Sequence, residues 1–257
     1  MNSTAKSDRD QSTTVAHEFS SPADSQLISA SEGYERWAPT YDHAPNPLLA
    51  REERYLMPLF ANVQRRQVLD VACGTGRWLD RLIAQGATGA GTDISLAMLS
   101  IAKEKRAISG RLARANCAHL PFPSAAFDLA ICSFALGHIW ELESTASELA
   151  RVTKPGADLF VSDLHPEACA KGWRVGFRDA NMAIEIETLP RAMDEIVPAF
   201  SGNGFTCLKC ESLHLGNPEQ PIFEQAGKSR IFAEACKLPA ILICQFRRLD
   251  SQGSHGA

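Results

Sequence analysis

The sequence predicts an α/β fold with a mostly parallel sheet and helices on both faces, and two observations carry this prediction. The first is a short apolar run, 68–71, which ends in a glycine turn at Gly74 and Gly76. Continuously apolar, β-branched strands are typical of the centre of a parallel sheet. The second is that similar runs alternate with helical patterns further along the chain, as parallel crossovers require.

Composition favours one ordinary globular domain and excludes several functions. The chain has 257 residues, 45% of them hydrophobic and 22% charged, with a formal net charge of -4. This charge gives no sign of a nucleic-acid surface. No apolar stretch approaches the roughly 20 residues of a membrane span, and the first thirty residues lack a signal-peptide core. We expect a disordered polar arm over 1–30, a single domain over 31–250, a disordered tail over 251–257, and a cytoplasmic protein.

The glycine turn predicts a nucleotide-like ligand. Gly74 and Gly76 let the backbone approach a ligand closely, and the helix that follows presents free N–H groups. The third glycine of the dinucleotide fingerprint is replaced by Leu79. Asp70 lies near the end of the strand, where a carboxylate suits an ammonium group and repels a pyrophosphate. An amino-acid-bearing nucleoside therefore fits better than a dinucleotide.

Ahead of this strand, two helices are expected. Tyr34, Trp37 and Tyr41 share one helical face, and Pro39 should break or kink that helix. A second helix is predicted from Pro47 to about residue 59. The plain expectation for the aromatic face is that it packs on the sheet.

The remaining elements follow in order. Asp93 ends the second strand, about twenty residues past the glycines, where an acidic side chain can bind both ribose hydroxyls. Ser95 can cap the next helix. The later strands are expected near 112–115, 127–134, 158–163, 205–213 and 241–246, and the later helices near 142–152 and 191–200.

The segment 166–189 is predicted to form an inserted hairpin after the fifth strand. Residues 173–179 and 182–187 alternate like two short strands around a turn. Such an insertion would cover the active site, where Arg174 and Arg178 would hold an anionic or carbonyl-rich acceptor. The alternative is a solvated edge with ordinary surface arginines.

The eight cysteines are expected to be free thiols in a reducing compartment. Cys132, Cys236 and Cys244 lie in apolar runs, where cysteine behaves as a small hydrophobe. Cys207 and Cys210 form a Cys-x-x-Cys inside a predicted strand, where residues three apart should point to opposite faces. No metal site is expected.

Four ordered motifs resemble those of the class I S-adenosylmethionine-dependent methyltransferases. The motifs are Asp-Val-Ala-Cys-Gly-Thr-Gly at 70–76, Gly-Thr-Asp-Ile-Ser at 91–95, the segment 120–128 and Lys-Pro-Gly at 154–156. The short aromatic-rich helices ahead of the first strand resemble those of the quinone C-methyltransferases and of related small-molecule O- and N-methyltransferases. The resemblance implies a Rossmann-like, seven-stranded sheet, a helical lid over 31–64, and S-adenosylmethionine as cofactor, with S-adenosylhomocysteine as product. It implies cofactor contacts at Trp37, Tyr41, Asp70, Ala72, Cys73, Gly74, Gly76, Asp93, Ile94, Met98, Asn116, Cys117, Phe134 and Leu136.

Asn116 departs from the aspartate that is usual in this family, but its carbonyl still accepts a hydrogen bond from an adenine amine. His138 and His165 lie just past strand ends and are the candidate catalytic bases, with Tyr41 as an orienting group.

The predicted reaction is methyl transfer to O or N of a small, aromatic or heterocyclic acceptor. C-methylation of a quinone precursor is the alternative, and a non-catalytic S-adenosylmethionine-binding regulator is another. An NAD-dependent oxidoreductase is disfavoured by the missing third glycine. Acceptor identity and oligomeric state are left open.

Overall fold

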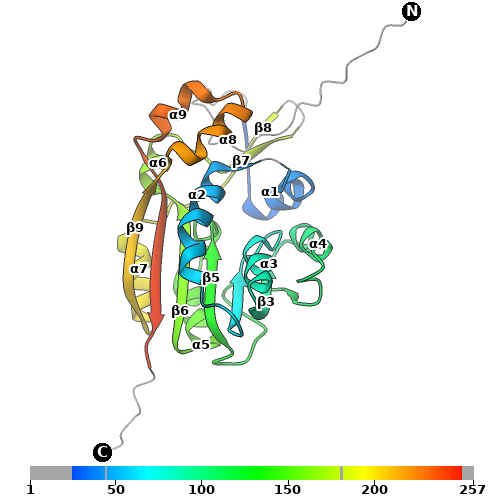
Figure 1. Cartoon of the computed structure of the whole chain (residues 1–257), viewed down its shortest axis with the longest axis vertical. Helices are drawn as coiled ribbons and strands as arrows, with labels where there is room; N and C mark the ends of the chain where they lie inside the picture. The colour runs from blue at the N-terminus through cyan, green and yellow to red at the C-terminus, as the bar shows by residue number, and fades with distance from the viewer. Residues whose placement is uncertain (1–24, 44, 180–181, 251–257) are drawn as a thin grey trace, which may run out of the picture.

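The computed structural model describes residues 25–43, 45–179 and 182–250, and its core is one seven-stranded sheet (Figure 1). The strand order is β4-β3-β2-β5-β6-β10-β9. β10 runs antiparallel to both of its neighbours, while β2 to β6 are parallel. The strand bounds are β2 Gln67–Val71, β3 Thr88–Asp93, β4 Leu112–Arg114, β5 Phe127–Ser133, β6 Thr153–Leu164, β9 Phe205–His214 and β10 Pro239–Arg248. The predicted fold is confirmed.

Helices cover both faces of this sheet because side chains alternate along its strands. Val68 packs with α2 and α3 in one buried cluster, whereas Leu69 and Val71 pack with α5 and α7 in the other. The main helices are α2 Pro47–Leu56, α3 Arg77–Ala84, α4 Leu96–Glu104, α5 Leu142–Val152 and α7 Met193–Gly202, and three shorter ones are α6 Pro166–Ala170, α8 Gln220–Gln225 and α9 Ser229–Ala235.

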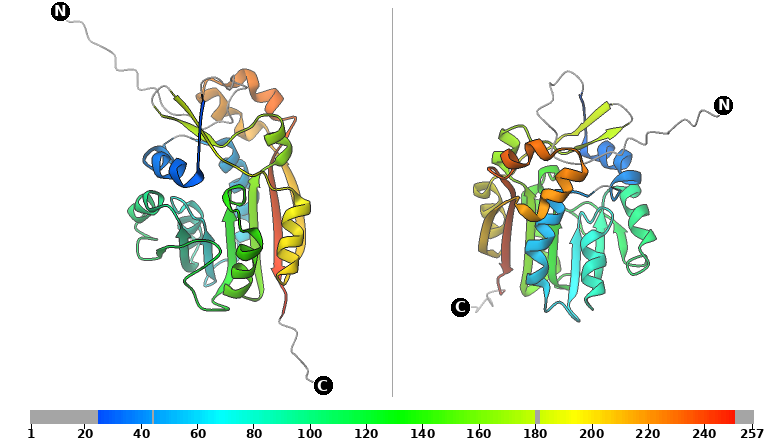
Figure 2. Two further views of the ribbon diagram at one scale, coloured as in Figure 1. Left: turned by 180° about the vertical axis from the view of Figure 1, so that it is seen from behind. Right: turned by 45° about the horizontal axis from the view of Figure 1, so that its top comes forward.

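A second, three-stranded sheet lies across one end of the main sheet (Figure 2). β7 (Gly176–Asp179) and β8 (Met182–Ile186) form the predicted hairpin, and β1 (Ser25–Ile28) pairs in parallel with β8. Helix α1 (Ala30–Trp37) follows β1, with Ser29 as its N-cap. The prediction of a disordered arm is therefore wrong for residues 25–30. The rest of that arm, 1–24, and the tail 251–257 lie outside the described residues.

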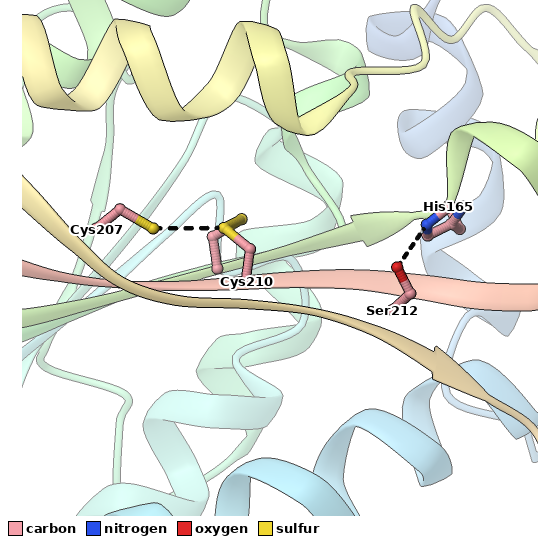
Figure 3. Close-up of a disulfide and its surroundings, with 5 residues drawn as sticks. His165, Cys207, Cys210 and Ser212 are labelled. Atoms are coloured by element: carbon pink, nitrogen blue, oxygen red, sulfur yellow. Dashed lines mark hydrogen bonds between the residues drawn. A yellow bond between two sulfur atoms is a disulfide. The ribbon is translucent and has the colours of Figure 1, made fainter.

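The cysteine predictions fail at β9 and β10. Cys210 forms a disulfide with Cys244, its partner in the strand register (Figure 3). The β9–β10 register shifts so that Leu208 is an extra, bulged residue. The bulge breaks the alternation, and Cys207 Sγ lies 3.5 Å from Cys210 Sγ rather than on the opposite face.

No helix among the described residues combines the length and the apolarity needed to cross a membrane.

Candidate functional site

A cavity of about 390 Å³ opens at the carboxyl ends of β2, β3 and β5, beneath α1. Ligands of open α/β sheets bind at this edge, next to the point where the strand order reverses. Twelve of the predicted site residues line the cavity: Tyr41, Asp70, Ala72, Cys73, Gly74, Asp93, Ile94, Met98, Asn116, Cys117, Phe134 and His138.

A side chain is excluded at the two motif glycines, Gly74 and Gly76, for different structural reasons. Both adopt a left-handed backbone, with φ of +54° at Gly74 and +78° at Gly76. A Cβ on Gly74 would meet nothing within 4 Å, so it would project into space that a ligand can use. A Cβ on Gly76 would clash with Ile108. Gly76 does not line the cavity, so its role is to let the turn pack closely.

Asp93 ties the glycine turn to the second strand. Its carboxylate accepts hydrogen bonds from the backbone N–H of Gly74 and of Ser95, both at 2.8 Å. Burial raises the pKa of this carboxyl, and the backbone N–H groups oppose that rise. The fixed carboxylate retains lone pairs that fit two vicinal hydroxyls, as the sequence predicts for a ribose.

Two groups at the base of the cavity fit the amino-acid end of S-adenosylmethionine. Asp70 is 2% exposed and accepts from Leu79 N at 3.0 Å. Arg77 Nη2 bonds the Glu52 carboxylate and Ser133 Oγ. Arg77 Nη1 is buried without a hydrogen bond among the described residues, and a Glu53 carboxylate oxygen lies 3.8 Å from it. A carboxylate residue, Asp70, and a guanidinium residue, Arg77, thus line the same cavity. This pair of charges matches a ligand that carries both an ammonium and a carboxylate.

The Asp70 carboxyl should make cofactor affinity depend on pH. Burial raises its pKa to about 7, and only the ionised form attracts an ammonium group. The affinity for S-adenosylhomocysteine should therefore rise about tenfold between pH 6 and pH 8, as the ionised fraction rises. Calorimetric titration across this range checks it. Asp70→Asn should abolish the rise, and 5′-methylthioadenosine, which has no ammonium group, should show none. If the affinity of Asp70→Asn still rises with pH, the pH dependence comes from another group.

Two strained residues shape the wall of the cavity. Ala72 and Phe134 have φ of +53° and +52°, which is unfavourable for residues with a side chain. They follow β2 and β5, and both line the cavity. Such strain concentrates at functional sites, where the surrounding fold holds it in place.

The aromatic lid residues cluster as predicted, but they do not all face the main cavity. The ring centroids of Trp37 and Tyr41 are 4.8 Å apart, and those of Trp37 and Phe177 are 5.1 Å apart. Trp37 lines a smaller neighbouring cavity, together with Tyr34 and Tyr41. The segment that follows these aromatic residues is joined to the glycine turn by a 2.8 Å hydrogen bond from Thr75 Oγ1 to an Asp42 carboxylate oxygen.

The protonation of His138 follows from its two partners. Nδ1 lies 3.1 Å from the Glu187 carbonyl oxygen, which can only accept, so Nδ1 carries the hydrogen. Nε2 then carries no hydrogen and accepts a hydrogen bond from the Tyr34 hydroxyl, whose oxygen lies 2.9 Å away. Burial lowers the pKa of His138, which favours a neutral imidazole able to take up a proton.

His165 and Leu136 do not line the cavity. His165 Nδ1 accepts from Glu167 N and so caps α6, while its Nε2 lies 2.9 Å from Ser212 Oγ (Figure 3). This geometry favours a structural role over the predicted catalytic one. Leu136 is the first residue of the 3₁₀ turn that ends at His138, and its side chain is fully buried in the core.

Sequence reasoning missed several residues of the site. Arg77 directly follows the glycine motif, which is a signal that was available. Tyr34 was noted only as an aromatic of the lid, and Glu187 contributes a backbone carbonyl, which no residue type reveals.

The fold and the position of the cavity are similar to those of the class I S-adenosylmethionine-dependent methyltransferases. Residues 68–156 match the family described as "Methyltransferase domain". Solved S-adenosylmethionine-dependent methyltransferases share the fold. One from Mesorhizobium loti has a TM-score of 0.61 and 19% identity, covering 77% of this chain and 98% of its own. A putative one from Listeria monocytogenes has a TM-score of 0.61 and 18% identity, and the match covers 79% of this chain and 100% of the Listeria chain.

Relatives by sequence include demethylmenaquinone methyltransferases. The one from Renibacterium salmoninarum is 34% identical over 135 residues, covering 50% of this chain and 56% of the relative. The one from Bacillus licheniformis is 41% identical over 96 residues, and the match covers 35% of this chain and 41% of the relative. The chain thus spans about half the length of these relatives, and it is related to the quinone methyltransferases.

Proposed function

We propose that this chain transfers a methyl group from S-adenosylmethionine to a ring carbon of a small hydroxylated aromatic acceptor of the quinol type. The observation that carries the proposal is the neutral, tautomer-fixed His138 at the cavity wall. The relatives named for demethylmenaquinone favour carbon as the methylated atom over the O or N expected from the sequence.

Bound S-adenosylmethionine supplies a methyl group on a good leaving group, so the protein needs little covalent machinery. Asp70, Arg77 and Asp93 hold the cofactor, and the lid residues exclude water from the reacting atoms. A ring carbon becomes a strong nucleophile only when the neighbouring phenolic hydroxyl loses its proton. His138 Nε2 is the acceptor for that proton, through the hydrogen bond on this nitrogen.

The test is incubation of the purified protein with S-adenosylmethionine and a demethylmenaquinol that carries a short isoprenoid chain, kept reduced. We expect a product one methyl heavier, with the methyl on a ring carbon by NMR. His138→Ala should lower turnover at least about tenfold with unchanged affinity for S-adenosylhomocysteine. Methylation of an oxygen atom would instead support the O-methylation expected from the sequence. If no acceptor is methylated, a non-catalytic regulator is favoured.

A further inference from the structure

Neither ring nitrogen of His138 is free to bond the hydroxyl of the methyl-accepting substrate. Nδ1 is engaged by the Glu187 carbonyl and Nε2 by the Tyr34 hydroxyl. A proton from an acceptor therefore reaches His138 only if Tyr34 moves away or passes it on. The three groups come from the residue that follows β8, from the 3₁₀ turn Leu136–His138 and from α1. The contacts therefore form only when these segments are assembled.

The Tyr34 hydroxyl is placed to pass the proton on. Tyr34 lines both the main cavity and the smaller aromatic one beside it. Its hydroxyl donates to His138 and keeps two lone pairs that can accept. Burial raises the pKa of Tyr34 well above its ordinary value, so the group stays a phenol and cannot accumulate as a phenolate. It can take up one proton only while it gives up its own.

The arrangement is held rigidly. The ring centroids of Tyr34 and His138 are 5.2 Å apart in an edge-on contact, and Tyr34 also stacks on Trp37. The turn carrying His138 is fixed because Gly137 N donates to the Asp163 carboxylate and Leu189 N donates to Gly137 O. Preorganised donors and acceptors of this kind need little rearrangement during a reaction.

We propose that Tyr34 is the catalytic group that touches the acceptor hydroxyl and relays its proton to His138, a proposal that rests on the proposed function. The acceptor O–H bond breaks and its proton bonds to Tyr34 Oη. In the same step the Tyr34 O–H bond breaks and its proton bonds to His138 Nε2. This leaves an imidazolium, whose Nδ1–H still bonds the Glu187 carbonyl, and an acceptor phenolate.

The relay then runs backward to close the cycle. The phenolate electron pair moves into the ring, and the ring carbon bonds to the methyl group while the bond from that methyl to sulfur breaks. The electron pair of the broken bond stays on sulfur, so S-adenosylhomocysteine is the neutral leaving group. The methylated ring carbon still carries its hydrogen, and that proton leaves to water as aromaticity returns. His138 gives its proton back through Tyr34 to the acceptor oxygen. One proton is released per methyl transferred, and His138 and Tyr34 regain their starting states.

Tyr34→Phe tests the relay, with Tyr55→Phe as the matched control. The Tyr55 hydroxyl bonds Glu211 and does not line the cavity, so the same chemical change is made away from the site. With the short-chain demethylmenaquinol, Tyr34→Phe should lower kcat at least about tenfold and leave the Kd for S-adenosylhomocysteine unchanged. Tyr55→Phe should change neither. A Tyr34→Phe enzyme with the kcat of the wild type would overturn the proposal.

The tautomer of His138 provides a test that needs no acceptor. Nitrogen-15 NMR of the imidazole should show a hydrogen on Nδ1 and none on Nε2, and Tyr34→Phe should shift the Nε2 resonance alone. A hydrogen on Nε2 would reverse the Tyr34 hydrogen bond and exclude the relay. A wild-type protein that shows the expected tautomer but does not methylate the quinol contradicts the proposed acceptor instead, so the two failures are distinguishable.

Discussion

Glu52→Ala should lower the free energy of unfolding by about 3–5 kcal/mol, the largest effect on stability that we expect. Glu52 is fully buried, and its carboxylate accepts from Arg77, from Trp78 Nε1 at 3.1 Å and from Ser133 Oγ at 2.7 Å. Ser162 Oγ is a further donor. Removing the carboxylate leaves a buried guanidinium and three neutral donors without their acceptor. Urea unfolding followed by circular dichroism measures the change.

The neighbouring residue supplies the control. Glu53 is partly exposed, at 31% of its side chain; it pairs with Arg81 at 2.8 Å, and its other oxygen lies 3.8 Å from Arg77 Nη1. Because partly exposed pairs contribute little and Arg77 keeps its bond to Glu52, Glu53→Ala should cost less than about 1 kcal/mol. A similar small loss in Glu52→Ala would mean that the buried network relaxes around the missing carboxylate. In that case the hydrogen-bond network around Glu52 would not be what holds α2 against α3 and against the ends of β5 and β6.

Asp93→Ala should weaken the binding of S-adenosylhomocysteine by more than about tenfold, or about 1.4 kcal/mol. The substitution removes the predicted ribose contact and also the acceptor that fixes Gly74 N at 2.8 Å. Both losses act in the same direction, because a looser glycine turn no longer presents a preformed site. Isothermal titration calorimetry gives the Kd directly.

Two further variants separate these causes. Asp93→Asn keeps one acceptor oxygen, which can serve Gly74 N, but it loses the charge and the bond from Ser95 N. An affinity lower than that of the wild type but above that of Asp93→Ala would measure the part that the glycine turn contributes. Asp80→Ala removes a carboxylate from α3 that does not line the cavity, and it should leave the Kd unchanged. Unchanged affinity in Asp93→Ala would place the ribose elsewhere.

The parts that local sequence encodes were predictable. Helix α5 begins and ends where its apolar spacing predicts, at Leu142 and Val152. The glycine turn and Asp93 lie together because a parallel sheet brings successive strand ends to one edge. The motif residues of the cavity follow from the same topology.

The parts that depend on distant partners were not predictable. Strand β1 exists because Ser25–Ile28 pairs with β8, far along the chain, and its four residues carry no strand signal of their own. Tyr34 and His138 are 104 residues apart in sequence, and the partner that sets the tautomer is a main-chain oxygen. The bulge at Leu208 reversed the expected direction of a cysteine side chain.

Parallel calorimetric titrations with S-adenosylmethionine, S-adenosylhomocysteine and NADH test the central claim most directly. The claim is that the cavity beneath α1 is built for an adenosyl amino acid. We predict micromolar binding of the two adenosyl compounds and no binding of NADH. Binding of NADH alone would contradict the assignment of the cofactor and of the reaction, and would leave only the fold.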